Sequence, residues 1–139
     1  MLLQLLAKLL GTAQRQSIEN QMTDNSMESR LKHKYSDNVV TRIHRQYDEE
    51  QSMIQNQMDA IDDKTSDEYK ELMAELKDSK EEEDKAVERE ENKATEYQDR
   101  IDRENAVLED RLSAISAYQE AWDNAINDDI QDNYGYFQR

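Results

Sequence analysis

Apolar residues recur at helical spacing through the second half of the chain. From residue 73 to residue 122, seven of the eight residues spaced seven apart are apolar or alanine, and a second row at Tyr69, Leu76 and Tyr97 follows the same spacing. Alternating steps of three and four residues are typical of helices that pack lengthwise on a partner helix. This periodicity favours long helices over a disordered acidic chain, which needs no such order.

The first half of the chain has a different apolar spacing. Apolar residues from Leu31 to Tyr47 are four apart, whereas Ile43 and Ile54 are eleven apart, as are Tyr47 and Met58. An eleven-residue period favours a nearly straight seam, meaning the row of side chains that packs on the partner helix. The predicted hairpin seam consists of Leu31, Tyr35, Ile43, Ile54, Met58, Met73, Leu76, Val87, Ile101, Leu108, Leu112 and Ile115.

One polar break separates the two halves. Residues 62–66 contain no apolar side chain, and Thr65 with Glu68 matches the capping box that begins many helices. The sequence therefore predicts a first arm over 1–61, a loop over 62–66 with a Thr65–Glu68 cap, and a second arm over 67–134. Antiparallel partners then have residue numbers that add to about 130. The predicted fold is all-α: residues 1–139 form a single long antiparallel helical hairpin, a two-helix coiled coil, that assembles with copies of itself.

Composition excludes several classes of protein. The 139 residues include two Gly, no Pro and no Cys, which disfavours sheet folds with many turns, disulfides and thiolate metal sites. The formal net charge of −15 disfavours nucleic acid and anionic membrane as partners. Residues 1–47 carry seven basic and four acidic side chains, and residues 48–111 carry ten basic and 24 acidic ones. In the predicted register, Lys34 lies near Glu96 and Arg42 near Glu88.

Residues 2–13 are apolar around most of the helix. Six leucines lie in this segment, and only Gln4, Lys8 and Gly11 stay on its polar side. Burying six leucines is worth on the order of 12 kcal/mol, more than one partner helix can provide, although Trp122 and Ile126 could cover part of the face. We therefore expect copies of the same protein to cover the leucines.

Other uses of this leucine-rich segment fit less well. A cleavable signal peptide requires a basic residue before its apolar core, and no basic residue precedes Leu2. The apolar run is also half of the ~20 residues that span a membrane. An in-plane membrane helix stays open as an alternative, although a narrow polar face on an acidic chain disfavours membrane contact.

The other end of the chain is aromatic. Gly135 predicts the end of the second helix, followed by a tail over 135–139 that is either frayed or docked on a neighbouring subunit. The predicted oligomer interface consists of Leu2, Leu3, Leu5, Leu6, Leu9, Leu10, Trp122, Ile126, Tyr134, Tyr136 and Phe137.

No residue pattern indicates catalysis. His33 and His44 are eleven apart, whereas a helical metal pair needs four, and neither completes a Glu-x-x-His motif. The acidic run at residues 80–84 is typical of a solvent-exposed helix. We therefore expect no enzyme activity, no catalytic or metal site, no cofactor and no small-molecule substrate.

The chain resembles subunits of exported helical filaments in architecture. Type III secretion needle and filament proteins, and the coiled-coil ends of flagellins, combine an apolar terminal helix like Leu2–Leu10 with a helical seam like Tyr97–Ile130. The resemblance implies terminal helices that line a filament core, with the loop at residues 62–66 outward. The sequence differs from that pattern in its polar, aromatic end and in the acidic belt over 48–110.

Two functions therefore follow as expectations. The first is a structural coiled-coil subunit of a filament or similar helical polymer, packed through its leucine-rich helix and located in an extracellular appendage after export without a cleavable signal. The alternative is an adaptor or chaperone in the cytoplasm, or a virion accessory protein, that binds a partner through the same segment.

Overall fold

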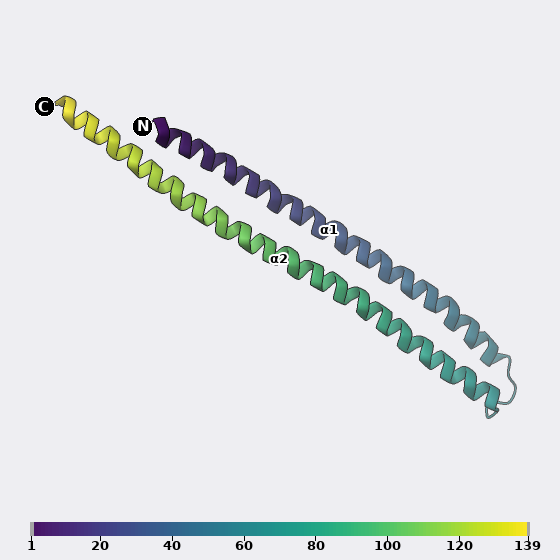
Figure 1. The fold of residues 1–139 in the computed structure, drawn as a ribbon. Helices are drawn as coiled ribbons and strands as arrows, with labels where there is room; N and C mark the ends of the chain where they lie inside the picture. Colours follow the sequence, from purple (N-terminus) through teal and green to yellow (C-terminus); the bar gives the residue numbers. More distant parts are fainter. Residues whose placement is uncertain (1, 139) are drawn as a thin grey trace. The chain divides into compact units, whose positions relative to one another are not determined.

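Two long helices make up the fold. The computed structural model describes the backbone of residues 2–138 and the side chains of residues 2–131. Helix α1 (Leu2–Asp59) and helix α2 (Asp67–Gln138) are joined by a short loop, and no strand occurs in residues 2–138 (Figure 1). The predicted all-α helical hairpin is confirmed.

The hairpin divides into two compact units, each made from both helices. The terminal unit contains Met1–Glu28 and Asp99–Arg139, and the loop unit contains Ser29–Gln98. Each unit is described by itself below.

Polar contacts between the helices establish their direction and register. In the terminal unit they join Lys8 to Asp123, Thr12 to Gln119 and Asn25 to Asn105. In the loop unit they join Ser29 to Gln98, His33 to Gln98, His44 to Glu83 and Gln51 to Glu83. Partner numbers fall as α1 numbers rise, so the helices are antiparallel within each unit, and the predicted register near 130 is confirmed.

Apolar burial between the helices is sparse. The buried apolar side chains are Ile18, Ile101, Leu108 and Ile126 in the terminal unit, and Ile54 and Met58 in the loop unit. Ile43, Leu76, Val87, Leu112 and Ile115 are half-buried. These positions follow the predicted seam, and the eleven-residue steps from Ile43 to Ile54 and from Tyr47 to Met58 stay on its buried side.

Three predicted seam residues lie outside the seam. Leu31 is 66% exposed, Tyr35 is 56% exposed and Met73 is 50% exposed. A row with steps of four turns by about 40° around the helix at each step, so its first members face away from α2 when its last members face towards it. Met73 loses its place to its neighbour Leu72, which is half-buried in the row that continues to Leu76.

Polar residues occupy seam positions in the middle of the hairpin. Ser36 and Ser79 are buried, and Glu83 and Glu90 are half-buried. The Oγ atom of Ser79 is buried without a hydrogen-bond partner. Small and charged side chains provide little apolar area there, so the seam is thin in this part of the hairpin.

The loop is closed by polar contacts at both of its ends. Lys64 Nζ donates to the carbonyl of Met58 at 3.0 Å, so a cation stabilises the end of α1. Ser66 Oγ accepts from the backbone N–H of Tyr69 at 3.2 Å, which makes Ser66 the N-cap of α2. The predicted cap formed by Thr65 and Glu68 is wrong by one residue. The Thr65 hydroxyl and backbone N–H both donate to Asp63 Oδ1, which lowers the pKa of Asp63.

Replacing Ser66 by alanine is expected to lower the free energy of unfolding by about 1 kcal/mol, because one N–H at the start of α2 loses its acceptor. Urea unfolding followed by circular dichroism measures the loss. The matched variant Thr65→Ala should cost less, because the backbone bond from Thr65 to Asp63 remains. A larger loss of stability for Thr65→Ala than for Ser66→Ala would contradict the Ser66 cap and support the Thr65 cap that the sequence predicts.

The second helix is longer than the sequence predicts. Gly135 lies within α2, which continues to Gln138, so it does not end the helix. The side chains of Tyr134, Tyr136 and Phe137 lie outside the described residues.

Candidate interaction site

Six exposed leucines form the main apolar surface of the terminal unit. Leu2, Leu3, Leu5, Leu6, Leu9 and Leu10, here called the leucine face, are between 42% and 79% exposed. Together they leave on the order of 600 Å² of leucine surface accessible, near the upper end for apolar patches on monomeric proteins. A surface of this size on a charged chain is a candidate interaction site.

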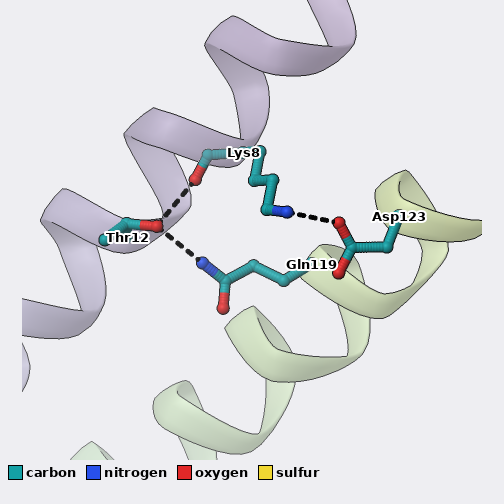
Figure 2. Close-up of polar contacts among 4 residues, drawn as sticks. All are labelled: Lys8, Thr12, Gln119 and Asp123. Atoms are coloured by element: carbon teal, nitrogen blue, oxygen red, sulfur yellow. Dashed lines mark hydrogen bonds and ion pairs between the residues drawn. The ribbon is translucent and has the colours of Figure 1, made fainter. Parts of the chain in front are cut away.

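Polar contacts with α2 hold the leucine face outward. Lys8 Nζ lies 2.7 Å from Asp123 Oδ1, and Gln119 Nε2 donates to Thr12 Oγ1 at 3.1 Å (Figure 2). Thr12 Oγ1 in turn donates to the carbonyl of Lys8. These contacts come from the polar side of the segment, so the side expected in solvent faces α2 instead.

Small and amide side chains occupy the packed side of the same segment. Gln4, Ala7 and Gly11 are half-buried, and a Cβ atom at Gly11 would lie only 3.3 Å from Gln119 Cγ. The side-chain oxygen of Gln4 is buried without a hydrogen-bond partner. An isolated chain therefore exposes leucine and buries an unpaired amide oxygen, and both cost free energy.

Trp122 and Ile126, two other predicted interface residues, are less exposed than the leucines. Trp122 is half-buried and lines a groove of about 190 Å³ with Leu10, Ile115 and Tyr118. This groove adjoins the leucine face through Leu10, so a leucine of another chain has an apolar place to insert. Ile126 is buried in the seam of its own hairpin and is not available to a second chain, contrary to expectation.

The loop unit contains a hydrogen-bonded group of three side chains that sequence reasoning missed. We call His44, Glu83 and Gln51 the triad. His44 Nδ1 lies 2.7 Å from Glu83 Oε1, and Gln51 Nε2 donates to Glu83 Oε2 at 2.8 Å. The bond to Glu83 raises the pKa of His44, and the same bond lowers the pKa of Glu83. His44 is exposed, and its bond to Glu83, like that of Gln51, joins α1 to α2. The predicted antiparallel register brings these residues within reach of each other. The register is therefore the feature of the sequence from which the triad could have been predicted.

Stability is expected to depend on pH through this triad. A histidine whose pKa is raised by folding adds stability below its unfolded pKa of 6.5, and loses it as pH rises through the folded value. A glutamate whose pKa is lowered adds stability above its unfolded pKa of 4.5, and loses it as pH falls through the folded value. The contribution is therefore largest between these two pH values, where nearby Asp48 and Asp84 also favour the charged histidine.

The thermal midpoint of the wild type relative to His44→Gln should be highest near pH 5.5 and should decline towards pH 8.5. Circular dichroism melts at matched ionic strength measure the difference. A difference that is constant from pH 5 to pH 8.5 would show that the bond contributes nothing to stability. The variant His33→Gln is the control, because His33 bonds a neutral amide, Gln98, rather than a carboxylate.

The predicted salt bridges across the hairpin are absent. Among the side chains of residues 2–131, no ion pair joins Lys34 to Glu96 or Arg42 to Glu88. Lys34, Arg42 and Arg45 lie exposed on the side of α1 that carries Leu31 and Tyr35. The seam faces α2 with Lys32 and Ser36 instead, and Lys32 lies 5.5 Å from the ring centroid of Tyr97.

The described residues contain neither a metal-binding cluster nor a membrane-spanning helix. Residues 2–131 contain no group of three potential ligand side chains that could hold a metal ion, and no helix stretch among the described residues is apolar and long enough to cross a membrane. No family model, no curated protein and no solved structure matches the chain. We therefore infer function from the residues and their geometry.

Proposed function

We propose that the chain is a structural coiled-coil subunit that assembles with copies of itself into a helical polymer through the leucine face. The observation that supports this is the outward orientation of six leucines on a helix whose polar side is held against α2 by the Lys8–Asp123 pair. Standard interfaces bury about 800 Å² per partner. The leucine face provides most of that area, and the groove beside Trp122 adds to it.

Copies of the chain suit this surface better than an anionic membrane does. Lys8 is the only basic residue among the leucines, and it pairs with Asp123. Glu120, Asp128 and Asp129 lie on the adjoining part of α2, so an anionic lipid surface would be repelled. Another leucine face brings apolar area without that charge.

Sedimentation velocity over a hundredfold range of concentration, with electron microscopy of the same samples, tests the proposal. Long ordered polymers are expected. A monomer at every concentration would overturn self-assembly. A discrete small oligomer would overturn the polymer and favour an adaptor that presents the leucines to another partner. Cosedimentation with anionic vesicles but not with neutral ones would instead favour a membrane-associated helix.

A further inference from the structure

A second exposed surface lies on α1 in the loop unit, where Tyr35 contacts Lys32 of the same helix with its ring centroid 5.3 Å from Lys32 Nζ. Lys34, Arg42 and Arg45 share one side of the helix with the exposed Leu31 and Tyr35, because these positions fall within about 100° of helix circumference. We call these five residues the basic face. They contribute three positive charges to a chain whose net charge is −15.

The cations of the basic face, Lys34, Arg42 and Arg45, form no ion pair with the described side chains of their own chain. Arg42 and Arg45 are three residues apart, and like charges at that spacing destabilise a helix slightly. An external anionic surface would remove this repulsion.

One flank of α2 carries the opposite charge at a matching length. Glu71, Glu75, Asp78 and Glu82 are exposed and follow one another in steps of four, three and four, which keeps them on one side of the helix. We call these residues the acidic flank. Glu71 and Glu75 repel each other, as do Asp78 and Glu82, and none of the four takes part in an ion pair among the described side chains.

These two surfaces cannot meet within one hairpin. In the observed register, α1 residues 34–45 lie opposite α2 residues 85–96, whereas the acidic flank at 71–82 lies opposite α1 residues 48–59. The cations of the basic face and the carboxylates of the acidic flank each span eleven residue steps, about 16 Å of helix, so their charges can be matched when two copies lie side by side with a lengthwise offset.

We propose that the basic face of one copy binds the acidic flank of a second copy, with Leu31 and Tyr35 buried in the contact. This inference rests on the proposed function, and it assigns the second interface that a polymer needs. A leucine face that pairs with itself closes as a dimer, whereas a contact between two different surfaces repeats from copy to copy, into an open filament where the rotation does not close a ring. Charge complementarity makes this contact sensitive to salt.

The test compares assembly of three charge variants by light scattering and electron microscopy. Lys34→Glu/Arg45→Glu reverses the basic face, Glu75→Lys/Glu82→Lys reverses the acidic flank, and the fourfold variant combines them. Each double variant is expected to raise the concentration needed for polymers at least about tenfold, and the fourfold variant is expected to restore it. Raising NaCl from about 0.05 M to about 0.5 M should increase the concentration that the wild type needs for polymers by a similar factor.

Two controls separate this contact from general charge effects and from the leucine face. Arg103→Glu/Arg111→Glu changes the net charge by the same amount as Lys34→Glu/Arg45→Glu but lies in the terminal unit, and it should leave assembly nearly unchanged. Because the chain has no cysteine, Asn38→Cys and Ala74→Cys chains, each also carrying Leu6→Asp, report the contact by disulfide cross-linking. The mixture should cross-link at least about tenfold faster than an Asn38→Cys mixture with Thr95→Cys, an exposed residue of α2 that lies outside the acidic flank, about 32 Å further along the helix than Ala74.

The outcomes are distinguishable. Assembly that is unchanged by both double variants, or a fourfold variant that stays unassembled, would overturn the basic-face contact while leaving the leucine face intact. Cross-linking in the Leu6→Asp background that does not exceed the Thr95→Cys control would also overturn it. A wild-type monomer with specific cross-linking would overturn the leucine face alone. Binding of DNA by the wild type, lost in Lys34→Glu/Arg45→Glu, would overturn the inference in favour of a nucleic-acid surface.

Discussion

Replacing Leu6 by aspartate is expected to abolish polymer assembly through the leucine face at concentrations where the wild type assembles, while helix content stays nearly unchanged. Leu6 is 52% exposed in the isolated chain, so its own hairpin loses little burial. In an assembly the variant loses about 2 kcal/mol of leucine burial and must also bury a carboxylate, which costs several kcal/mol more. The association constant should therefore fall at least about 1000-fold. Sedimentation equilibrium measures the association, and far-ultraviolet circular dichroism measures the helix content.

Two matched variants show whether the leucine face itself is responsible. Leu6→Met keeps an apolar side chain of similar volume and should assemble nearly as the wild type does. Asn20→Asp adds the same charge to an exposed position of α1 about four turns further on, and it should change association little. If Leu6→Asp assembled at wild-type concentrations, or if Asn20→Asp were equally damaging, the leucine face would not be the interface.

The sequence contains enough information for the fold and its register. A chain without Pro and with two Gly has few places to turn, and its single polar break divides it into two arms of similar length. These constraints alone predict partners such as Asn25 with Asn105, which the structure brings within 3.0 Å. Register is well determined here because both arms must align over many turns from one short loop.

The rotation of each helix about its axis was harder to predict. Apolar residues such as Leu31 and Tyr35 look like seam residues in a count of spacings, but the seam passes through Asn25, Ser29 and Lys32 instead. Hydrogen bonds and a cation–π contact satisfy these polar groups between the helices, which a count of apolar residues ignores.

The same difficulty affects the candidate site. Helix periodicity places the six leucines on an apolar face, yet the direction of this face depends on contacts made by Lys8 and Thr12 on the opposite side of the helix. Small residues such as Gly11 allow α2 to approach on that side. Helix periodicity places residues on a common face, but the partner helix decides which face turns inward.

The stability of the packing between α1 and α2 is expected to depend on very few apolar side chains. The variant Ile101→Ala tests this expectation. Ile101 is 3% exposed and is one of six buried apolar residues among the described side chains. Its truncation removes burial and leaves a cavity between the helices, so we expect the free energy of unfolding to fall by about 3 kcal/mol and the thermal midpoint by about 10 °C. Urea and thermal unfolding measure the two quantities.

The control for Ile101→Ala is Val107→Ala, which truncates an exposed β-branched residue of the same helix and the same unit. This variant loses little burial and gains the higher helix propensity of alanine, so its stability should stay within about 0.5 kcal/mol of the wild type. Ile101 is buried between the helices whereas Val107 is 51% exposed, which is why the two truncations should differ so widely. Equal losses from both would mean that helix propensity, rather than packing between α1 and α2, determines the stability of the terminal unit.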